Sequence, residues 1–441
     1  MHGFPALASL VIAVALVFAP VGAHALPDRT SATLDALVEA SGASGSAFDR
    51  ALALMAAAEG AVGVKATPVD VPVYDTPAEA LQAVLDATGA DARDAARAAE
   101  ETLAGLEAPV ARALTRTLAA FVAYHHAGSD LDLGGIFGAR ASLVAAARDL
   151  RDAVAAHPAA AQAPALVIPT VLSIDLGSEP NTYTADFALL VDAGGDDVYL
   201  NNAGGSSAST YCSVGRPAAL LDFGGNDTYG PTKRLCGING GANLGAGFLL
   251  DAAGHDRYFA AGYGGNGGAR SGGAGFLLDL EGNDVYEGGD TGTNGGANVG
   301  SGFLLDIAGN DTYRARGNGT NGAGHGTGAG FLLDAEGNDT YSAKNRGVNG
   351  GAFNAATGFL ADLSGDDRYE AGKEGVNGGV SGSSLSGSPA LTYGFGLLYD
   401  GDGRDVYVDE ENASGVDRSA PMKGLAGFQI DHARPKRPES L

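Results

Sequence analysis

Sixteen aspartates recur at fixed positions between residues 192 and 405 of this 441-residue chain. They belong to a repeated pattern, Leu-x-Asp-x-x-Gly-Asn-Asp-x-Tyr, in which Gly, Asp and Tyr stand three, five and seven residues after the first Asp in all eight units. Successive units are 27 to 30 residues apart, apart from a last spacing of 38. The first column contains Asp192, Asp222, Asp251, Asp279, Asp306, Asp334, Asp362 and Asp400. The second column contains Asp197, Asp227, Asp256, Asp284, Asp311, Asp339, Asp367 and Asp405. The tyrosine column contains Tyr199, Tyr229, Tyr258, Tyr286, Tyr313, Tyr341, Tyr369 and Tyr407.

Carboxylates that recur with the period of a structural repeat come together when the repeats stack. Neighbours in a column would lie about 4.8 Å apart, where two like charges repel by roughly 3.5 kcal/mol at an effective dielectric constant of 20. Basic residues cannot offset this repulsion everywhere, because residues 279–306 contain no Lys or Arg. A Ca²⁺ ion binds several carboxylate and carbonyl oxygens at once. We therefore expect calcium as the cofactor and all sixteen aspartates as its ligands.

The same residues have a second interpretation, as turn caps. Asp and Asn side chains at a turn accept hydrogen bonds from the backbone two residues further on. A second landmark of the repeat, Asn-Gly, is interpreted as such a corner ladder, and the tyrosines as a packed stack with hydroxyls in the aspartate network. The Asn column contains Asn239, Asn266, Asn294, Asn321, Asn349 and Asn377.

A repeat of about 28 residues without a helical face predicts a parallel β-solenoid. The unit is too short for a propeller blade, which needs about 40 residues, and it contains short strands separated by Gly, Asn and Asp. We expect a small N-terminal helical bundle followed by about eight coils, with a degenerate unit at residues 174–183 and a half unit at 427–431. An array of antiparallel hairpins is the alternative.

Each strand should present its side chains alternately to the two faces. In the repeated Phe-Leu-Leu run, we expect Phe and the last Leu to point inward and the middle Leu to face outward. The outward column would be an apolar stripe that the helical domain or a second copy of the chain covers. It contains Leu249, Leu277, Leu304, Leu332, Leu360 and Leu397.

Two units, Gly309-Asn310-Asp311-Thr312-Tyr313 and Gly337-Asn338-Asp339-Thr340-Tyr341, resemble half of the hemolysin-type (RTX-like) calcium-binding repeat. In that family, Gly-rich turns between short parallel strands hold Ca²⁺ through Asp and backbone carbonyls. The resemblance covers residues 192–407 and implies that the second column binds the ion. It departs from the family in its 28-residue period and in the Asp-x-x that replaces a Gly-Gly pair.

The first part of the chain has a different composition. Residues 1–25 have the apolar run and small-x-small end of a signal peptide without a basic start, with an uncleaved anchor as the alternative. Residues 26–161 form an Ala-rich helical domain of five or six helices, residues 166–431 the solenoid, and residues 432–441 a basic, Pro-containing tail. Thr76-Pro77-Ala78-Glu79 is a helix start. His125 and His126 are interpreted as a surface pair at a helix end.

These features favour an exported protein, secreted or held at the cell surface or in the periplasm. Cys212 and Cys236 suit an oxidising compartment, either bridged or free. With 52 acidic and 27 basic residues, the net charge is −25, which argues against nucleic acid as a partner. We expect a rigid structural or adhesive module that contacts an envelope or extracellular component such as a glycan. A β-helix enzyme acting on polysaccharide, as a lyase or a glycoside hydrolase, is the alternative, with its site near residues 381–405.

Overall fold

The computed structural model describes the following residues: 26–61, 65–206, 215–230, 236–345, 348–353, 356–372, 377–378, 380–381, 395–409, 412–416, 420–422 and 427–431. It confirms N-terminal helices followed by a parallel β-solenoid, whose three sheets run together through about six coils.

Six α-helices lie in the described part of the N-terminal region: α2 (Leu26–Ser41), α3 (Ala47–Ala61), α4 (Pro77–Thr88), α5 (Arg93–Ala104), α6 (Ala108–Ser129) and α7 (Leu133–Ala156). A short 3₁₀ helix, η1 (Pro158–Gln162), follows them. The start of α4 is as predicted. Thr76 is the N-cap, and its hydroxyl accepts a hydrogen bond from the Glu79 backbone, while Gly89 ends the helix in a left-handed conformation.

The solenoid has three sheets, and each coil between residues 242 and 409 adds one strand to each. Sheet A contains, in spatial order, β1 (Leu166–Ile168), β2 (Leu172–Asp175), β4 (Leu189–Asp192), β6 (Ala218–Asp222), β9 (Ala246–Asp251), β12 (Ala274–Asp279), β15 (Ser301–Asp306), β18 (Ala329–Asp334), β21 (Thr357–Asp362), β24 (Phe395–Asp400), β28 (Gly427–Asp431) and β27 (Ala420–Met422).

Sheet B contains β26 (Asn412–Val416), β25 (Val406–Asp409), β22 (Arg368–Ala371), β19 (Thr340–Ala343), β16 (Thr312–Ala315), β13 (Val285–Gly288), β10 (Arg257–Ala260), β7 (Thr228–Tyr229), β5 (Val198–Tyr199) and β3 (Thr182–Tyr183). Sheet C contains β23 (Val380–Ser381), β20 (Ala352–Phe353), β17 (Gly324–His325), β14 (Ala297–Asn298), β11 (Ala269–Arg270) and β8 (Ala242–Asn243).

Repeating strands pair in parallel and in register, so identical positions stack. For example, Asp279 pairs with Asp251 on one side and Asp306 on the other. This pairing excludes the array of antiparallel hairpins. The degenerate units follow the same register, since Asp175 pairs with Asp192 and Asp431 with Asp400. Antiparallel strands occur at the ends, where β1, β26 and β27 pair.

The sequence prediction assigned the residues of the sheet A strands to the wrong sides, inner for outer. Leu249, Leu277, Leu304, Leu332 and Leu360 are buried inside the coil against the tyrosine column, and Leu398, not Leu397, is their equivalent at β24. The Phe residues and the last Leu of each strand lie on the other side. The prediction of an outward column at Leu249, Leu277, Leu304, Leu332, Leu360 and Leu397 was therefore wrong.

The reason lies in the narrow interior of each coil. In the strand Ser301–Asp306, Gly302, Leu304 and Asp306 share the inner side by alternation. A Cβ atom on Gly302 would lie 2.3 Å from the Gly296 carbonyl oxygen and 2.8 Å from that of Gly295. The interior therefore accepts glycine at this position, and it leaves the bulky Phe side chains to the outer side.

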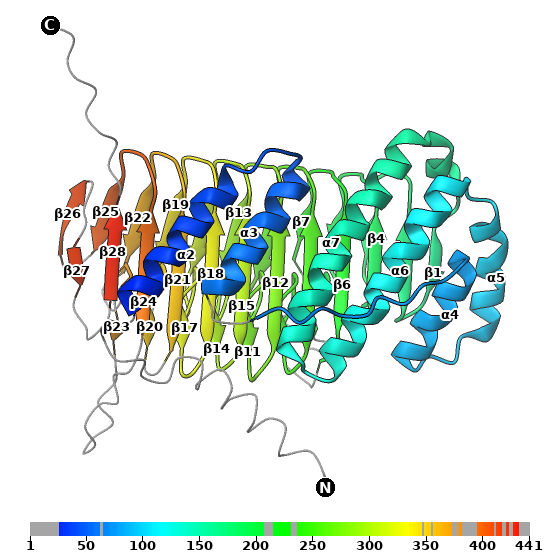
Figure 1. The fold of residues 1–441 in the computed structure, drawn as a ribbon, viewed down its shortest axis with the longest axis horizontal. Coiled ribbons are helices and arrows are strands. Elements are labelled where there is room, and N and C mark those ends of the chain that lie inside the picture. Colours follow the sequence, from blue (N-terminus) through cyan, green and yellow to red (C-terminus); the bar gives the residue numbers. More distant parts are fainter. Residues whose placement is uncertain are drawn as a thin grey trace, which may run out of the picture.

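The helices cover this outer side. They lie along one flank of the solenoid in front of sheet A (Figure 1), and they share one hydrophobic core with its outer column. Phe137 of α7 packs edge-on against Phe276 and Phe303, with ring centroids 5.0 and 4.9 Å away. The buried Arg140 guanidinium lies over the Phe276 ring at 4.3 Å. An apolar stripe under the helices therefore exists, but phenylalanine makes it.

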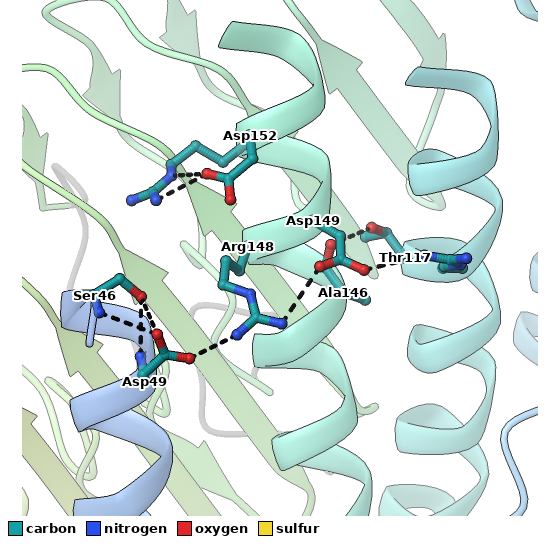
Figure 2. A network of polar contacts seen from close by, with 9 residues as sticks. Ser46, Asp49, Thr117, Ala146, Arg148, Asp149 and Asp152 are labelled. Atoms are coloured by element: carbon teal, nitrogen blue, oxygen red, sulfur yellow. Dashed lines mark hydrogen bonds and ion pairs between the residues drawn. The ribbon is translucent and has the colours of Figure 1, made fainter. Parts of the chain in front are cut away.

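Polar contacts join the helices to one another. Figure 2 shows Arg148 of α7 between two carboxylates: its guanidinium lies 2.8 Å from Asp49 of α3 and 3.5 Å from Asp149. Thr117 of α6 donates a hydrogen bond to the Ala146 carbonyl of α7 over 3.3 Å. Ion pairs and hydrogen bonds therefore join the helices in addition to their hydrophobic core.

Three further predictions concern single sites. His125 is not at the surface as expected: it is buried in α6, with its ring 5.7 Å from that of Phe121, while its neighbour His126 is exposed. The reason is that adjacent helical residues point to different faces, and one of those faces packs inward.

Cys236 is disulfide-bonded, while Cys212 lies outside the described residues. Residues 1–25 lie outside them too. None of the helices in the described ranges has the length and apolar character to cross a bilayer.

Candidate metal centre

The first aspartate column stands at the ends of the sheet A strands. Each of its eight side chains is fully buried, because Asp shares the inner side of the strand with Gly and the middle Leu. Asp279, for instance, ends β12 directly above Asp251 and below Asp306. The parallel register thus builds a continuous row of interior carboxyl groups, as the sequence predicted.

The tyrosine hydroxyls contact this column. The Tyr286 hydroxyl lies 2.9 Å from Asp279 Oδ2 and 2.7 Å from Asp306 Oδ2, so it bridges two coils. Tyr229, Tyr258 and Tyr313 bridge in the same way. The rings stack from Tyr183 to Tyr407, with centroids 4.6 to 5.1 Å apart. A phenol has one proton, so each hydroxyl can donate to one of its two carboxylates.

The second column lies in the corner between sheets A and B. From Asp197 to Asp367, each backbone N–H of this column donates to the Oδ1 atom of the equivalent aspartate in the next coil, as from Asp256 to Asp284 over 2.5 Å and from Asp284 to Asp311 over 2.6 Å. The preceding corner glycine is needed for this close approach. A Cβ atom on Gly309 would lie 2.2 Å from the Gly282 carbonyl oxygen and 2.5 Å from Asp311 Oδ2.

These contacts leave one oxygen of seven second-column side chains without a hydrogen-bond partner. The buried atoms are the Oδ2 oxygens of Asp197, Asp227, Asp256, Asp284, Asp311, Asp339 and Asp367. In the first column, the Oδ1 oxygens of Asp279 and Asp334 are buried and unpartnered in the same way. A buried polar atom without a partner costs free energy, so these oxygens need either a proton or a cation.

The columns converge in groups of three. Each group takes one second-column aspartate from one coil and both aspartates from the next, and each residue offers one oxygen within 4.8 Å of the other two. The groups include Asp197–Asp222–Asp227, Asp227–Asp251–Asp256, Asp256–Asp279–Asp284, Asp284–Asp306–Asp311 and Asp311–Asp334–Asp339. All of these residues are buried. Such triads of carboxylate oxygens could hold metal ions, and hard divalent cations prefer oxygen ligands.

The electrostatic environment favours neutralisation. Burial and then the charges of Asp251, Asp284 and Asp227 raise the pKa of Asp256 to about 11. Burial and then the charge of Asp222 raise the pKa of Asp251 to about 8. The groups that raise these pKa values are other aspartates, so ionised carboxylates in the row need a compensating cation.

The turn-cap interpretation holds for part of the first column. The Oδ1 atoms of Asp192, Asp222 and Asp251 accept hydrogen bonds from the backbone two residues further on, at 2.9, 3.1 and 3.2 Å. The Asn ladder is confirmed as a buried corner device: Asn266 donates from Nδ2 to Asn294 Oδ1 over 2.9 Å and to the Tyr258 carbonyl over 3.2 Å. Both interpretations of the repeat therefore apply, to different residues.

Sequence reasoning grouped the aspartates by column and did not predict triads that join two coils. The signal was present in the five-residue offset between the columns, since a five-residue corner brings the second Asp back toward the strand end. Asp400 and Asp405 occupy the same buried columns at the last coil. Residues 382–394 of the segment proposed for a polysaccharide site, residues 381–405, lie outside the described residues.

Comparison of the chain with protein-family models, with curated proteins and with solved structures finds no match. The resemblance to hemolysin-type repeats therefore stays at the level of the short motif.

Proposed function

We propose that this chain is an exported rod protein, a structural or adhesive module of the cell surface or extracellular space, whose buried aspartate row binds Ca²⁺. The observation that carries the proposal is the set of buried carboxylate triads with unpartnered oxygens. Ca²⁺ accepts six to eight oxygen ligands in flexible geometry, whereas Mg²⁺ demands a tight octahedron. The corner offers carboxylate and carbonyl oxygens close together.

Two features support this proposal, one for export and one for a rigid module. The disulfide at Cys236 is typical of proteins from oxidising compartments, where millimolar calcium is also found. The repeat provides a rigid body, because consecutive coils are joined by strand pairing in three sheets and by stacked tyrosines. An envelope glycan or another extracellular component is the partner that suits such a module.

The test is thermal unfolding of the full chain in EDTA, in Ca²⁺ and in Mg²⁺ at matched ionic strength, which removes simple charge screening. An ion that binds the folded state alone raises stability, by about 2.7 kcal/mol at a hundredfold excess over its dissociation constant. We expect a higher midpoint in Ca²⁺ than in the other two buffers. Equal midpoints in all three would contradict the proposal.

Two adjacent aspartates provide matched variants. Asp367 is buried in the second column, whereas Asp366 is exposed and accepts a hydrogen bond from the Arg404 backbone at the surface. We expect Asp367→Asn to reduce the calcium-dependent rise in midpoint and Asp366→Asn to leave it unchanged. An equal effect of both substitutions would indicate a general charge effect instead of a site.

A further inference from the structure

Consecutive triads share one residue, and in the triads Asp197–Asp222–Asp227 to Asp311–Asp334–Asp339 the shared residue is always a second-column aspartate. Asp227, Asp256, Asp284 and Asp311 of the second column each belong to two consecutive triads. The first-column members, such as Asp279 and Asp306, belong to one triad each. A cation in one triad would therefore share a second-column carboxylate with the cation in the next triad along the rod.

The atoms available for sharing are well defined. Asp284 is 1% exposed, its Oδ1 accepts the Asp256 backbone N–H, and its Oδ2 has no partner. In the triad Asp256–Asp279–Asp284, each residue has one buried oxygen without a partner: Oδ2, Oδ1 and Oδ2 respectively. The row thus offers interior oxygens that point to a ligand, in addition to its acidic composition.

The charge count selects the type of ion. Each coil contributes one aspartate from each column, or two negative charges when both are ionised, and one divalent cation per coil cancels them. A monovalent ion would leave each coil with a net negative charge, and a trivalent ion would leave a net positive charge, both at a cost in a buried row. Neighbouring ions would lie about one strand spacing apart, roughly 4.8 Å.

We propose that the aspartate row binds one divalent cation per coil in a single file, in which neighbouring ions share a carboxylate and therefore bind cooperatively. The proposal rests on the proposed function and adds its stoichiometry and its regulation. The first ion fixes a shared carboxylate in its ionised form and in its bound orientation. The next site along the rod then has one ligand already in place, so its affinity is higher.

Two isosteric substitutions in one coil distinguish shared from unshared ligands. Asp284→Asn alters two triads, whereas Asp279→Asn alters one. Native mass spectrometry of the full chain in calcium counts the bound ions. We expect the Asp279→Asn protein to hold one ion fewer than the wild type, and the Asp284→Asn protein to hold two fewer. At partial loading, we expect wild-type molecules that are mostly empty or mostly full.

A second measurement uses the unmodified protein and does not depend on whether the variants fold. Mn²⁺ replaces Ca²⁺ as a spectroscopic probe, and electron paramagnetic resonance is recorded from the first additions onward. Cooperative binding in a file predicts spectra broadened by neighbouring ions well below saturation. Sharp, isolated-ion spectra until the row is nearly full would overturn the proposal.

The outcomes distinguish failure of the shared ion file from failure of the proposed function. Bound calcium that falls by one ion in both variants would overturn the shared file and leave the calcium-binding rod intact. A wild-type chain that binds neither Ca²⁺ nor Mn²⁺ would overturn both the file and the proposed function.

Discussion

The two sides of the same sheet A strand face opposite chemical environments. In β15, Phe303 and Leu305 belong to the core that the helices cover, while Leu304 and Asp306 lie inside the coil. The outer side is stabilised by apolar burial, which is indifferent to pH and metal ions. The inner side combines an apolar column with buried carboxyl groups, and its stability depends on what neutralises them. One six-residue strand therefore carries both the scaffold and the candidate site.

The largest expected effect is on the inner side and comes from pH. In the metal-free protein, the pKa of Asp251 is about 8, against an ordinary value of 3.8, and those of Asp284 and Asp339 are also about 8. Between the ordinary pKa of 3.8 and the folded-state pKa of about 8, the folded state binds more protons than the unfolded state. The contribution of these protonated carboxyl groups to the free energy of unfolding is therefore complete below about pH 3.8, falls as the pH rises, and is lost by about pH 8.

Calcium should reverse this dependence, because the ion binds ionised carboxylates and its affinity rises with pH. We expect the unfolding midpoint in EDTA to fall between about pH 5 and pH 8, and the midpoint in calcium to stay level or rise over the same range. Calorimetry or circular dichroism in matched buffers measures both. Parallel curves with and without calcium would show that the row does not exchange protons for metal.

The next effect concerns the outer side. Phe303 is buried under α7 against Phe137, so Phe303→Ala should lower the free energy of unfolding by about 3–5 kcal/mol through lost burial and a cavity. The loss should be the same in EDTA and in calcium, because this side chain faces away from the carboxylates. Denaturant unfolding in both buffers measures it. A loss that depends on calcium would mean that the two sides of the strand are coupled.

The comparison also shows what the sequence could reveal. The repeat period and the stacking of Asp, Tyr and Asn followed from spacing, because a solenoid translates sequence period directly into spatial neighbours. Spacing favoured parallel strands but left antiparallel hairpins open, and the strand pairing excludes the hairpins. The inner and outer sides did not, because both Phe and Leu are apolar and the covering helices are remote in sequence. Strand alternation could have assigned the two sides, because Gly302, Leu304 and Asp306 lie on the same side of their strand. Glycine recurs at the Gly302 position in every middle coil, and this recurrence indicates that the side it shares with Leu304 is the narrow interior.

The burial of His125 and the triads that join the two aspartate columns could not be predicted from the sequence for a similar reason. A helix face is defined by what packs on it, and Tyr124 of α6 packs against Phe248 of sheet A, more than a hundred residues away in the chain. The triads depend on how a five-residue corner turns, which brings Asp256 close to Asp279 and Asp284 of the next coil. Periodicity predicts which residues stack, and the corner geometry determines which columns meet.

The smallest expected effect tests the hydroxyl bridge on the inner side. Tyr286→Phe keeps the ring in its stack, 4.7 and 4.8 Å from its neighbours, and removes the hydroxyl that contacts Asp279 and Asp306. Loss of this buried donor should lower the free energy of unfolding by about 1–2 kcal/mol. Tyr124→Phe is the matched control, since Tyr124 is equally buried in the helix layer and its hydroxyl has no hydrogen-bond partner. We expect that substitution to be neutral or slightly stabilising, with both variants measured by chemical denaturation in calcium. If Tyr286→Phe is also neutral, the tyrosine column stabilises the rod by stacking alone, and the carboxylates obtain their compensation from the bound ion without help from the phenols.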